Sequence, residues 1–311
     1  MAEGPSSVPQ GSSATSARSR RVIAFMNQKG GVGKTTTTVT LASAFAKAGR
    51  PTLLIDLDPQ AHATLHVGID PNELQSSVYD VLLDPAMDPR SAIRKVRDNL
   101  HVLPAQTDLA AAETELTPVA DRQSRLEKAL DKLAGEYEFV LIDCPPSLGL
   151  LTLNGLACAR EVIIPMQAHF LALQGVSKLL ETIAIMSRAV NPKLRVTGIV
   201  LCMHDGNLMH SKEVVADLEQ FFDSARDQET PWRFARVLKP AIRRNIKLAE
   251  CPSFGQTIFE YAPNAPGAVD YKELSEGLLR EWDAMKSRRS ANAPEIVVPV
   301  QGTPQAVGAK A

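Results

Sequence analysis

Long apolar runs, cysteine pairs and net charge are all scarce in this chain of 311 residues. It contains no run of about 18 uncharged apolar residues, so we expect no membrane-spanning helix. The first residues lack the apolar core of a signal peptide, which argues against secretion. The four cysteines form no Cys-x-x-Cys pair, so neither a zinc site nor a disulfide framework is indicated. A net charge of −1, taken alone, argues against a nucleic-acid-binding protein.

Two segments of biased composition lie at the ends of the chain. Residues 1–21 are rich in Gly, Pro and Ser, and residues 287–311 contain three prolines and few charges. Neither segment shows the periodicity of a helix or strand that could join a core, so we expect a flexible arm at each end.

Between these arms, apolar runs alternate with helix-like stretches. We expect strands at 22–26, 52–55, 100–103, 139–142, 161–165 and 196–201, and helices at 35–48, 122–133, 172–190, 212–222 and 268–285. Continuous apolar strands separated by helices are typical of a mostly parallel sheet covered on both faces. The sequence therefore predicts a single doubly wound α/β domain over residues 22–286, which is large enough to bury its own core.

The strongest local motif is Lys-Gly-Gly-Val-Gly-Lys-Thr-Thr at residues 29–36, between the first expected strand and the first expected helix. Glycines allow backbone N–H groups to surround phosphates, and the N-terminus of a helix adds partial positive charge. Lys34 is expected to reach the β- and γ-phosphates of a nucleotide, and the Thr35 hydroxyl to ligate Mg²⁺. Gln28 stands where the ordinary P-loop pattern has glycine. A glycine-rich turn with solvated lysines is the alternative interpretation.

Carboxylates follow two of the expected strands. Asp56 and Asp58 end the second strand, and Asp143 ends a later one. Ligands of open α/β sheets bind beside the carboxyl ends of the strands, so these side chains should meet the phosphate loop. Asp143 is expected on the Mg²⁺ side, through a water molecule. A helix cap or turn residue is the alternative for each aspartate.

Together these segments resemble the ParA/MinD group of P-loop ATPases, which carry a deviant Walker A motif. The resemblance is carried by residues 29–36, by Ile-Asp-Leu-Asp-Pro-Gln at 55–60 and by Ile-Asp-Cys-Pro-Pro-Ser at 142–147. Residues 245–255, Asn-Ile-Lys-Leu-Ala-Glu-Cys-Pro-Ser-Phe-Gly, resemble the ParA (Soj-like) partition branch in particular. The resemblance covers about residues 22–285.

The resemblance implies a site for ATP and Mg²⁺. Lys29 corresponds to the signature lysine, which reaches the partner's phosphates in an ATP-bound homodimer, much as an arginine finger does. Asp58 would position the attacking water, Asp56 would lie beside the metal with Thr35, and Asp143 would be the Walker B carboxylate. Adenine would lie near Met203 and Asn245. The phosphates would be held by Lys29, Gly30, Gly31, Val32, Gly33, Lys34, Thr35 and Thr36.

Residues 230–249 contain six basic residues and no acidic ones. This strip carries +6 and the remaining residues −7, so the net charge does not exclude conditional DNA binding. A basic strip of this kind would bind DNA phosphates without sequence specificity. The family resemblance points to the same region, although Arg243 stands where relatives often have proline. We assign DNA contact to Arg236, Arg243, Arg244 and Lys247, with a solvated basic face as the alternative.

The expected function is an ATP-dependent partition switch that is cytoplasmic and associated with the nucleoid, without membrane attachment. ATP would drive dimerisation and non-specific DNA binding, and a ParB-like partner would stimulate hydrolysis and release. Positioning of another cellular assembly is the main alternative, and a binding protein that uses nucleotide only structurally is a third. The His62/His66 pair has metal-ligand spacing on a helix but no further ligand pattern, which favours ordinary surface or satisfied histidines.

Overall fold

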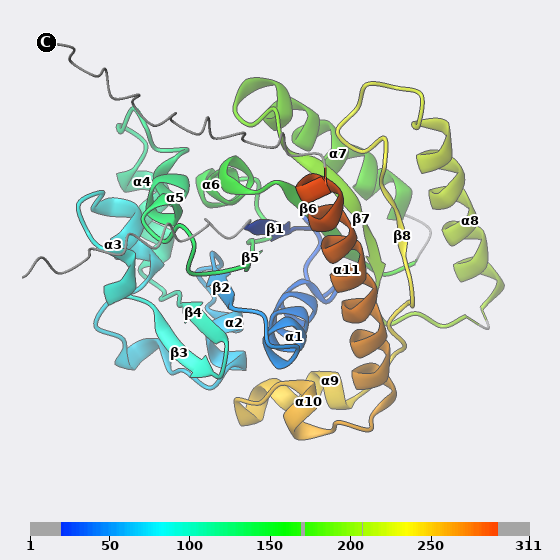
Figure 1. Cartoon of the computed structure of the whole chain (residues 1–311), viewed down its shortest axis with the longest axis horizontal. Coiled ribbons are helices and arrows are strands. Elements are labelled where there is room, and N and C mark those ends of the chain that lie inside the picture. The colour runs from blue at the N-terminus through cyan, green and yellow to red at the C-terminus, as the bar shows by residue number, and fades with distance from the viewer. Residues whose placement is uncertain (1–19, 169–171, 207, 292–311) are drawn as a thin grey trace, which may run out of the picture.

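An eight-stranded sheet with the order β3-β4-β2-β5-β1-β6-β7-β8 runs through the centre of the computed structural model, which describes residues 20–168, 172–206 and 208–291 (Figure 1). The strands are β1 Arg21–Phe25, β2 Thr52–Asp56, β3 Arg94–Arg97, β4 Leu100–Leu103, β5 Phe139–Asp143, β6 Glu161–Met166, β7 Arg195–Leu201 and β8 Arg236–Leu238. All neighbours pair in parallel except β3, which runs antiparallel to β4. The predicted doubly wound, mostly parallel α/β fold is therefore confirmed.

The central strands are apolar throughout because both faces of the sheet are covered. In β1 and the residue after it, Val22, Ala24 and Met26 join one buried cluster, whereas Ile23 and Phe25 join a second cluster on the opposite face. Successive side chains of a strand point to opposite faces, so a strand buried on both sides needs an unbroken apolar run.

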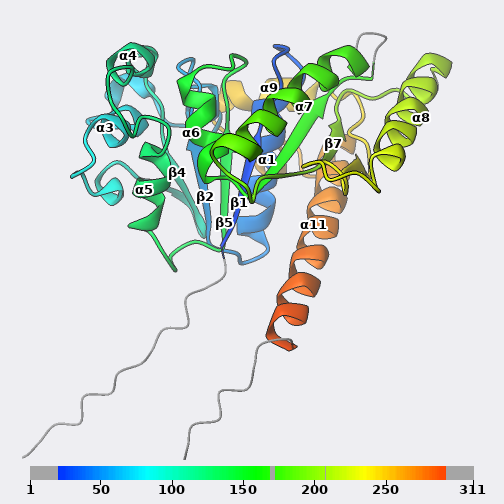
Figure 2. The ribbon, with the colours of Figure 1, turned by 90° about the horizontal axis from the view of Figure 1, so that it is seen from above.

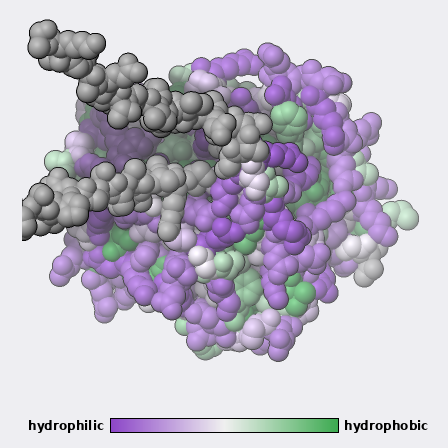
Figure 3. All heavy atoms as spheres, in the orientation of Figure 1, coloured by the Kyte–Doolittle hydropathy of each residue, from purple (hydrophilic) through white to green (hydrophobic). Residues whose placement is uncertain are grey.

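Two helical layers supply these clusters (Figure 2). One face is covered by α3 (Val78–Leu83), α4 (Leu109–Glu115), α5 (Arg125–Asp131), α6 (Leu150–Cys158), α7 (Ala172–Ala189) and α8 (Met209–Ser224). The other face is covered by α1 (Lys34–Lys47), α2 (His62–His66) and α11 (Pro266–Ala291). Polar side chains dominate the molecular face shown in Figure 3, where apolar side chains form only small separate groups.

Short elements complete the chain. The 3₁₀ turns are η1 (Pro71–Glu73), η2 (Pro89–Ser91) and η3 (Cys251–Phe254), and the short helices are α9 (Lys247–Glu250) and α10 (Ile258–Tyr261). The η3 turn packs against α2, and α10 packs against α1. In the described residues, no helix is both long enough and apolar enough to cross a bilayer.

The expected elements are all present, and their bounds shift by three residues or fewer except at the end of α11. That helix continues to Ala291, so the first residues of the expected C-terminal arm are helical. The rest of that arm, and residues 1–19 of the expected N-terminal arm, lie outside the described residues. The strands β3 and β8 were not predicted, nor were the helices α2, α3, α4, α6, α9 and α10.

Candidate ATP and magnesium site

The phosphate loop connects β1 to α1 and depends on glycine at a decisive position. Gly33, at the N-terminal boundary of α1, has a φ of 92°, a left-handed conformation that L side chains rarely adopt. A Cβ atom on Gly33 would also come within 3.2 Å of the Cys202 side chain. The start of the loop is tied to the sheet by Asn27, whose Oδ1 accepts from the Lys29 N–H at 3.0 Å and whose Nδ2 donates to the Pro165 carbonyl at 2.8 Å.

A cavity of about 810 Å³ opens beside this loop, at the carboxyl ends of the strands. This volume is within the usual range for small-molecule sites. The sequence-predicted residues that line it are Gly30, Gly31, Gly33, Lys34, Thr35, Thr36, Asp58, Met203 and Asn245. Four other predicted residues, Lys29, Val32, Asp56 and Asp143, do not line it. The Val32 side chain is buried, and Lys29 is exposed.

Thr35 and Asp143 form the oxygen-rich pair expected beside a magnesium ion. The Thr35 hydroxyl donates to Asp143 Oδ2 at 2.7 Å, and the Thr38 hydroxyl donates to Oδ1 at 3.2 Å. Burial raises the pKa of the Asp143 carboxyl, which Lys34 and the two hydroxyls only partly oppose. Hydroxyl and carboxylate oxygens are the ligands that Mg²⁺ prefers, and a cation here would stabilise the ionised form of Asp143.

Asp56 is fully buried next to Asp143 across the β2–β5 register and does not line the cavity. Its Oδ1 accepts from the Asp58 N–H at 3.1 Å, and its Oδ2 accepts from the N–H and hydroxyl of Thr64 at 2.9 and 2.8 Å. Burial and the neighbouring Asp143 raise the pKa of Asp56. Through these hydrogen bonds, Asp56 holds the segment after β2 in place. In this structure it does not present an open oxygen to the cavity where a metal would bind.

Asp58 is the carboxylate of this segment that reaches the cavity. Its Oδ1 accepts from the Gln60 N–H at 3.0 Å, and Oδ2 has no hydrogen-bond partner among the described residues. A carboxylate with a free oxygen beside the phosphate loop can accept a hydrogen bond from a water molecule.

Two further residues of the site were missed by the sequence analysis. Gln167 donates through Nε2 to the Gly31 carbonyl at 3.3 Å and to the Met203 sulfur at 3.1 Å, so it links the phosphate loop to the segment after β7. The Tyr271 hydroxyl lies 2.8 Å from the Thr37 hydroxyl of α1. The position of Gln167 directly after β6 was the one available signal, because that edge of the sheet carries the site.

Comparison with known proteins agrees with this geometry. A family model described as an AAA domain matches residues 20–196. The chain is 40% identical to the sporulation initiation inhibitor protein Soj of Bacillus subtilis over 257 residues, which are 82% of this chain and 97% of that protein. It is also 40% identical to the chromosome-partitioning ATPase Soj of Thermus thermophilus, over 83% of this chain and 95% of that one.

The chain belongs to the ParA/Soj family of P-loop ATPases. Among solved structures, it is similar to one titled cobyrinic acid a,c-diamide synthase from Mycobacterium smegmatis, which holds ADP and magnesium. That similarity has a TM-score of 0.71 and 39% sequence identity, and it covers 86% of this chain and 96% of the other.

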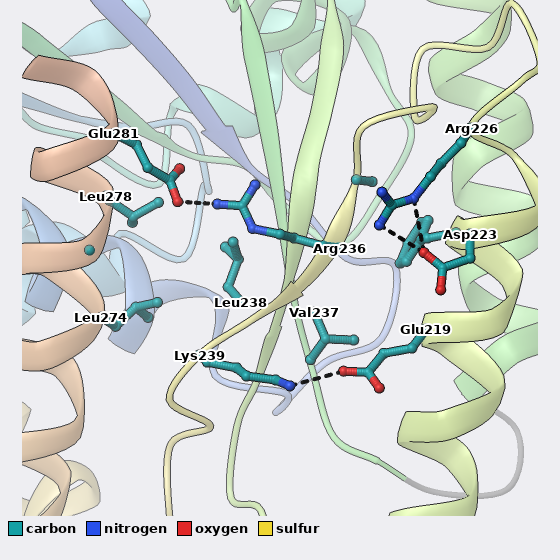
Figure 4. Close-up of a pocket in the computed structure, with 13 residues that line it drawn as sticks. Glu219, Asp223, Arg226, Arg236, Val237, Leu238, Lys239, Leu274, Leu278 and Glu281 are labelled. Atoms are coloured by element: carbon teal, nitrogen blue, oxygen red, sulfur yellow. Dashed lines mark hydrogen bonds and ion pairs between the residues drawn. The ribbon is translucent and has the colours of Figure 1, made fainter. Parts of the chain in front are cut away.

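The predicted basic strip of this ParA/Soj protein is largely neutralised by acidic residues from elsewhere in the fold. Arg236 pairs with Glu281 of α11, and Lys239 pairs with Glu219 of α8 at 3.2 Å (Figure 4). Further along, Arg243 pairs with Asp270 at 2.7 Å and Lys247 with Glu250 at 2.8 Å. The positive charge of the strip is therefore much smaller in three dimensions than its sequence indicates.

The four predicted DNA contacts of this ParA/Soj protein also lie in different places. Arg236 begins β8, at the amino end of the sheet, whereas Arg243, Arg244 and Lys247 lie near the ATP cavity, whose lining includes Asn245. Arg244 is exposed and forms no ion pair with any described residue. Of the four, it is the one whose charge is not paired with a carboxylate of the described residues.

Proposed function

We propose that this protein is an ATP-dependent switch of a DNA partition system. Binding of Mg²⁺ and ATP would drive dimerisation, the dimer would bind DNA without sequence specificity at the nucleoid, and a ParB-like partner would stimulate hydrolysis and release. The family supports the ATPase activity and a role in chromosome partition. The dimer, the DNA contact and the partner are the proposed steps.

The observation that carries the proposal is the placement of Lys29. It belongs to the phosphate loop but stays outside the cavity of its own chain, in an exposed position. A second chain that packs loop against loop would receive this lysine at its phosphates. Such a cation stabilises the charge that spreads over the transferred phosphoryl group in the transition state.

The remaining groups divide the chemistry within one chain. Lys34 would bind the phosphates, Thr35 and Asp143 would hold Mg²⁺, and the open oxygen of Asp58 would orient the attacking water. The magnesium ion would supply a Lewis acid that neutralises phosphate charge. No covalent intermediate with the protein is needed.

A synthase activity of the kind named for the M. smegmatis structure has less support if it requires a nucleophilic cysteine. The thiolate, and not the thiol, is the reactive form of cysteine. Burial raises the pKa of Cys158 to about 12 and of Cys202 and Cys251 to about 11, and it raises that of Cys144 well above its usual value. All four thiols are therefore neutral and poorly nucleophilic near neutral pH.

The test is ATP hydrolysis measured with and without DNA and a ParB-like protein. We expect slow basal hydrolysis that both additions together increase.

Asp58→Ala should still bind ATP and dimerise but hydrolyse at least about tenfold more slowly. Lys29→Ala should bind ATP but remain monomeric by light scattering, whereas the exposed-lysine control Lys178→Ala should dimerise normally.

Two outcomes would contradict the proposal. Normal turnover by Asp58→Ala would remove the water-orienting role, and ATP-dependent dimerisation of Lys29→Ala would remove the role of Lys29 across the interface. If the wild-type protein binds ATP and dimerises but never binds DNA, positioning of another cellular assembly becomes the better explanation.

A further inference from the structure

A second cavity, of about 400 Å³, is lined by three arginines from three different elements. Arg188 lies in the last turn of α7, Arg195 begins β7, and Arg233 lies in the loop between α8 and β8. Cys202, which lines the ATP cavity, directly follows β7 and is seven residues, or about 23 Å, beyond Arg195. The arginine pocket, defined as Arg188, Arg195 and Arg233, is therefore at the opposite end of the sheet from the ATP site.

The charges of the arginine pocket are not neutralised by the fold. Within the described part of the chain, none of the three arginines takes part in an ion pair. Among the described residues, the Arg195 side chain donates only to the backbone carbonyls of Pro192 and Leu194, at 2.8 and 2.7 Å, and the Arg233 guanidinium lies 4.5 Å from the Phe234 ring centroid. These contacts orient the guanidinium groups and leave their positive charge available, unlike the paired residues in Figure 4.

The polar atoms around the pocket suit an oxyanion. The Thr230 hydroxyl oxygen lines this region, is buried and has no hydrogen-bond partner, so it can donate to a ligand oxygen. Glu229 is the one carboxylate among the lining residues, which leaves a net charge of +2. The surface continues with exposed Arg160, whose carbonyl accepts from the Arg195 N–H at 3.0 Å, and with exposed Lys193.

We propose that the arginine pocket binds phosphodiester groups of the DNA backbone, as a contact separate from Arg244. Guanidinium groups match phosphate oxygens with two parallel hydrogen bonds, and they remain charged at any physiological pH. A duplex offers phosphates at regular intervals, which fits a positive surface that extends beyond one pocket. This inference rests on the proposed DNA-binding function and adds a second place of contact.

The test compares wild-type protein with the double variant Arg188→Gln/Arg195→Gln by fluorescence anisotropy on a short duplex, in Mg²⁺ and ATP, over a range of salt concentrations. Each lost phosphate contact should lower the slope of log Kd against log salt by about 0.9, so the double variant should lose about 1.8. Its affinity should fall about tenfold or more at low salt, while ATP hydrolysis without DNA stays unchanged.

Two matched variants sharpen the result. Lys178→Gln removes one positive charge from the same helix, ten residues or about 15 Å before Arg188, and should leave the slope unchanged. Glu229→Gln removes the pocket's carboxylate and should tighten DNA binding several-fold. Equal slopes for the wild-type protein and the double variant would overturn the proposal, and so would weaker binding by Glu229→Gln.

Failure of this inference can be told apart from failure of the proposed function. If wild-type protein binds DNA and Arg244→Glu abolishes binding while the double variant does not change it, only the arginine pocket is refuted. If wild-type protein binds no DNA in any nucleotide state, the proposed function falls with it. A third outcome would be that inorganic phosphate raises the melting temperature of the wild-type protein but not of the double variant, while the two proteins show equal slopes of log Kd for DNA against log salt. In that case the pocket binds free phosphate and not DNA.

Discussion

Three aspartates at one edge of the sheet differ in what surrounds their oxygens. Asp143 accepts from two threonine hydroxyls, and Asp56 accepts from Thr64 and the Asp58 backbone. Among these three, only Asp58 keeps an oxygen with no hydrogen-bond partner in the described part of the chain. The sequence indicated all three as functional because each ends or follows a strand. It could not separate a carboxylate whose two oxygens are bonded within the fold from one with an open oxygen, because that difference depends on hydrogen bonds to residues such as Thr64.

At the same scale, His66 gives a prediction for acid stability. Its pKa is lowered from 6.5 to about 4, because burial disfavours the imidazolium and Arg97 repels it, against a weaker attraction to Glu260. The unfolded chain therefore binds a proton that the folded chain does not in the interval from pH 6.5 down to 4. Above pH 6.5, the neutral His66 side chain should make its full contribution to the free energy of unfolding. As the pH falls from 6.5 to 4, that contribution should decrease by about 3 kcal/mol.

The measurement is urea unfolding of the wild-type protein and of His66→Gln at pH 7, 5.5 and 4. The difference in unfolding free energy between the two proteins should shrink as the pH falls. A constant difference would show that His66 does not titrate as its burial beside Cys251 implies, 3.5 Å from the thiol sulfur.

At the scale of elements, a buried ion pair joins β1, β6 and α11. Arg21 is 2% exposed, and its Nε and Nη2 bind the two Glu161 oxygens at 2.6 and 2.7 Å. Its Nη1 donates to the Leu278 carbonyl at 3.1 Å. Burial favours neutral Glu161, but Arg21 and the Thr197 hydroxyl hold the pKa of that carboxyl below its usual value.

Removing one partner of this pair should destabilise the fold strongly. Arg21→Met leaves Glu161 buried without its cation, so we expect a loss of about 3–5 kcal/mol in chemical unfolding. The double variant Arg21→Met/Glu161→Leu should recover a large part of that loss, because it leaves no unpaired buried charge. If the double variant is as unstable as Arg21→Met, the ion pair with Glu161 is not the cause of the loss. Arg21 would then stabilise the fold through its contact with the Leu278 carbonyl of α11 alone.

The elements that were predictable share a strong local signal, and those that were missed do not. The strands β1, β2 and β5 are continuous apolar runs, and the loop before α1 has an unmistakable glycine pattern. In contrast, β8 is three residues long and lies within a basic stretch. The neutralisation of that stretch depends on Glu219, Asp270 and Glu281, which the chain brings close only by folding.

For the whole molecule, charge placement implies a specific dependence on magnesium. The ATP cavity is lined by Asp58 and lies beside buried Asp143, and both carboxylates would repel a triphosphate. ATP with Mg²⁺ should raise the melting temperature by several degrees at saturation, since a ligand at 100 times its Kd contributes about 2.7 kcal/mol.

ATP with a chelator should give a much smaller rise in melting temperature, and Asp143→Asn should reduce the difference between the two conditions. Differential scanning fluorimetry checks this prediction. Equal shifts with and without magnesium would contradict the assignment of Thr35 and Asp143 to the ion.

Helix α11 connects the two ends of the molecule. It spans 26 residues, or about 39 Å. Tyr271, near its first turn, is joined to Thr37 of α1, directly behind the phosphate loop, and Glu281 and Trp282 lie far along it, toward the amino ends of the strands. A rigid rod of this length acts as a lever. A tilt of about 5° at Tyr271 displaces Ala291 by about 2.6 Å, given about 30 Å between them. If α1 tilted when nucleotide binds, the Thr37–Tyr271 contact and α11 would carry that movement to the far end of the protein.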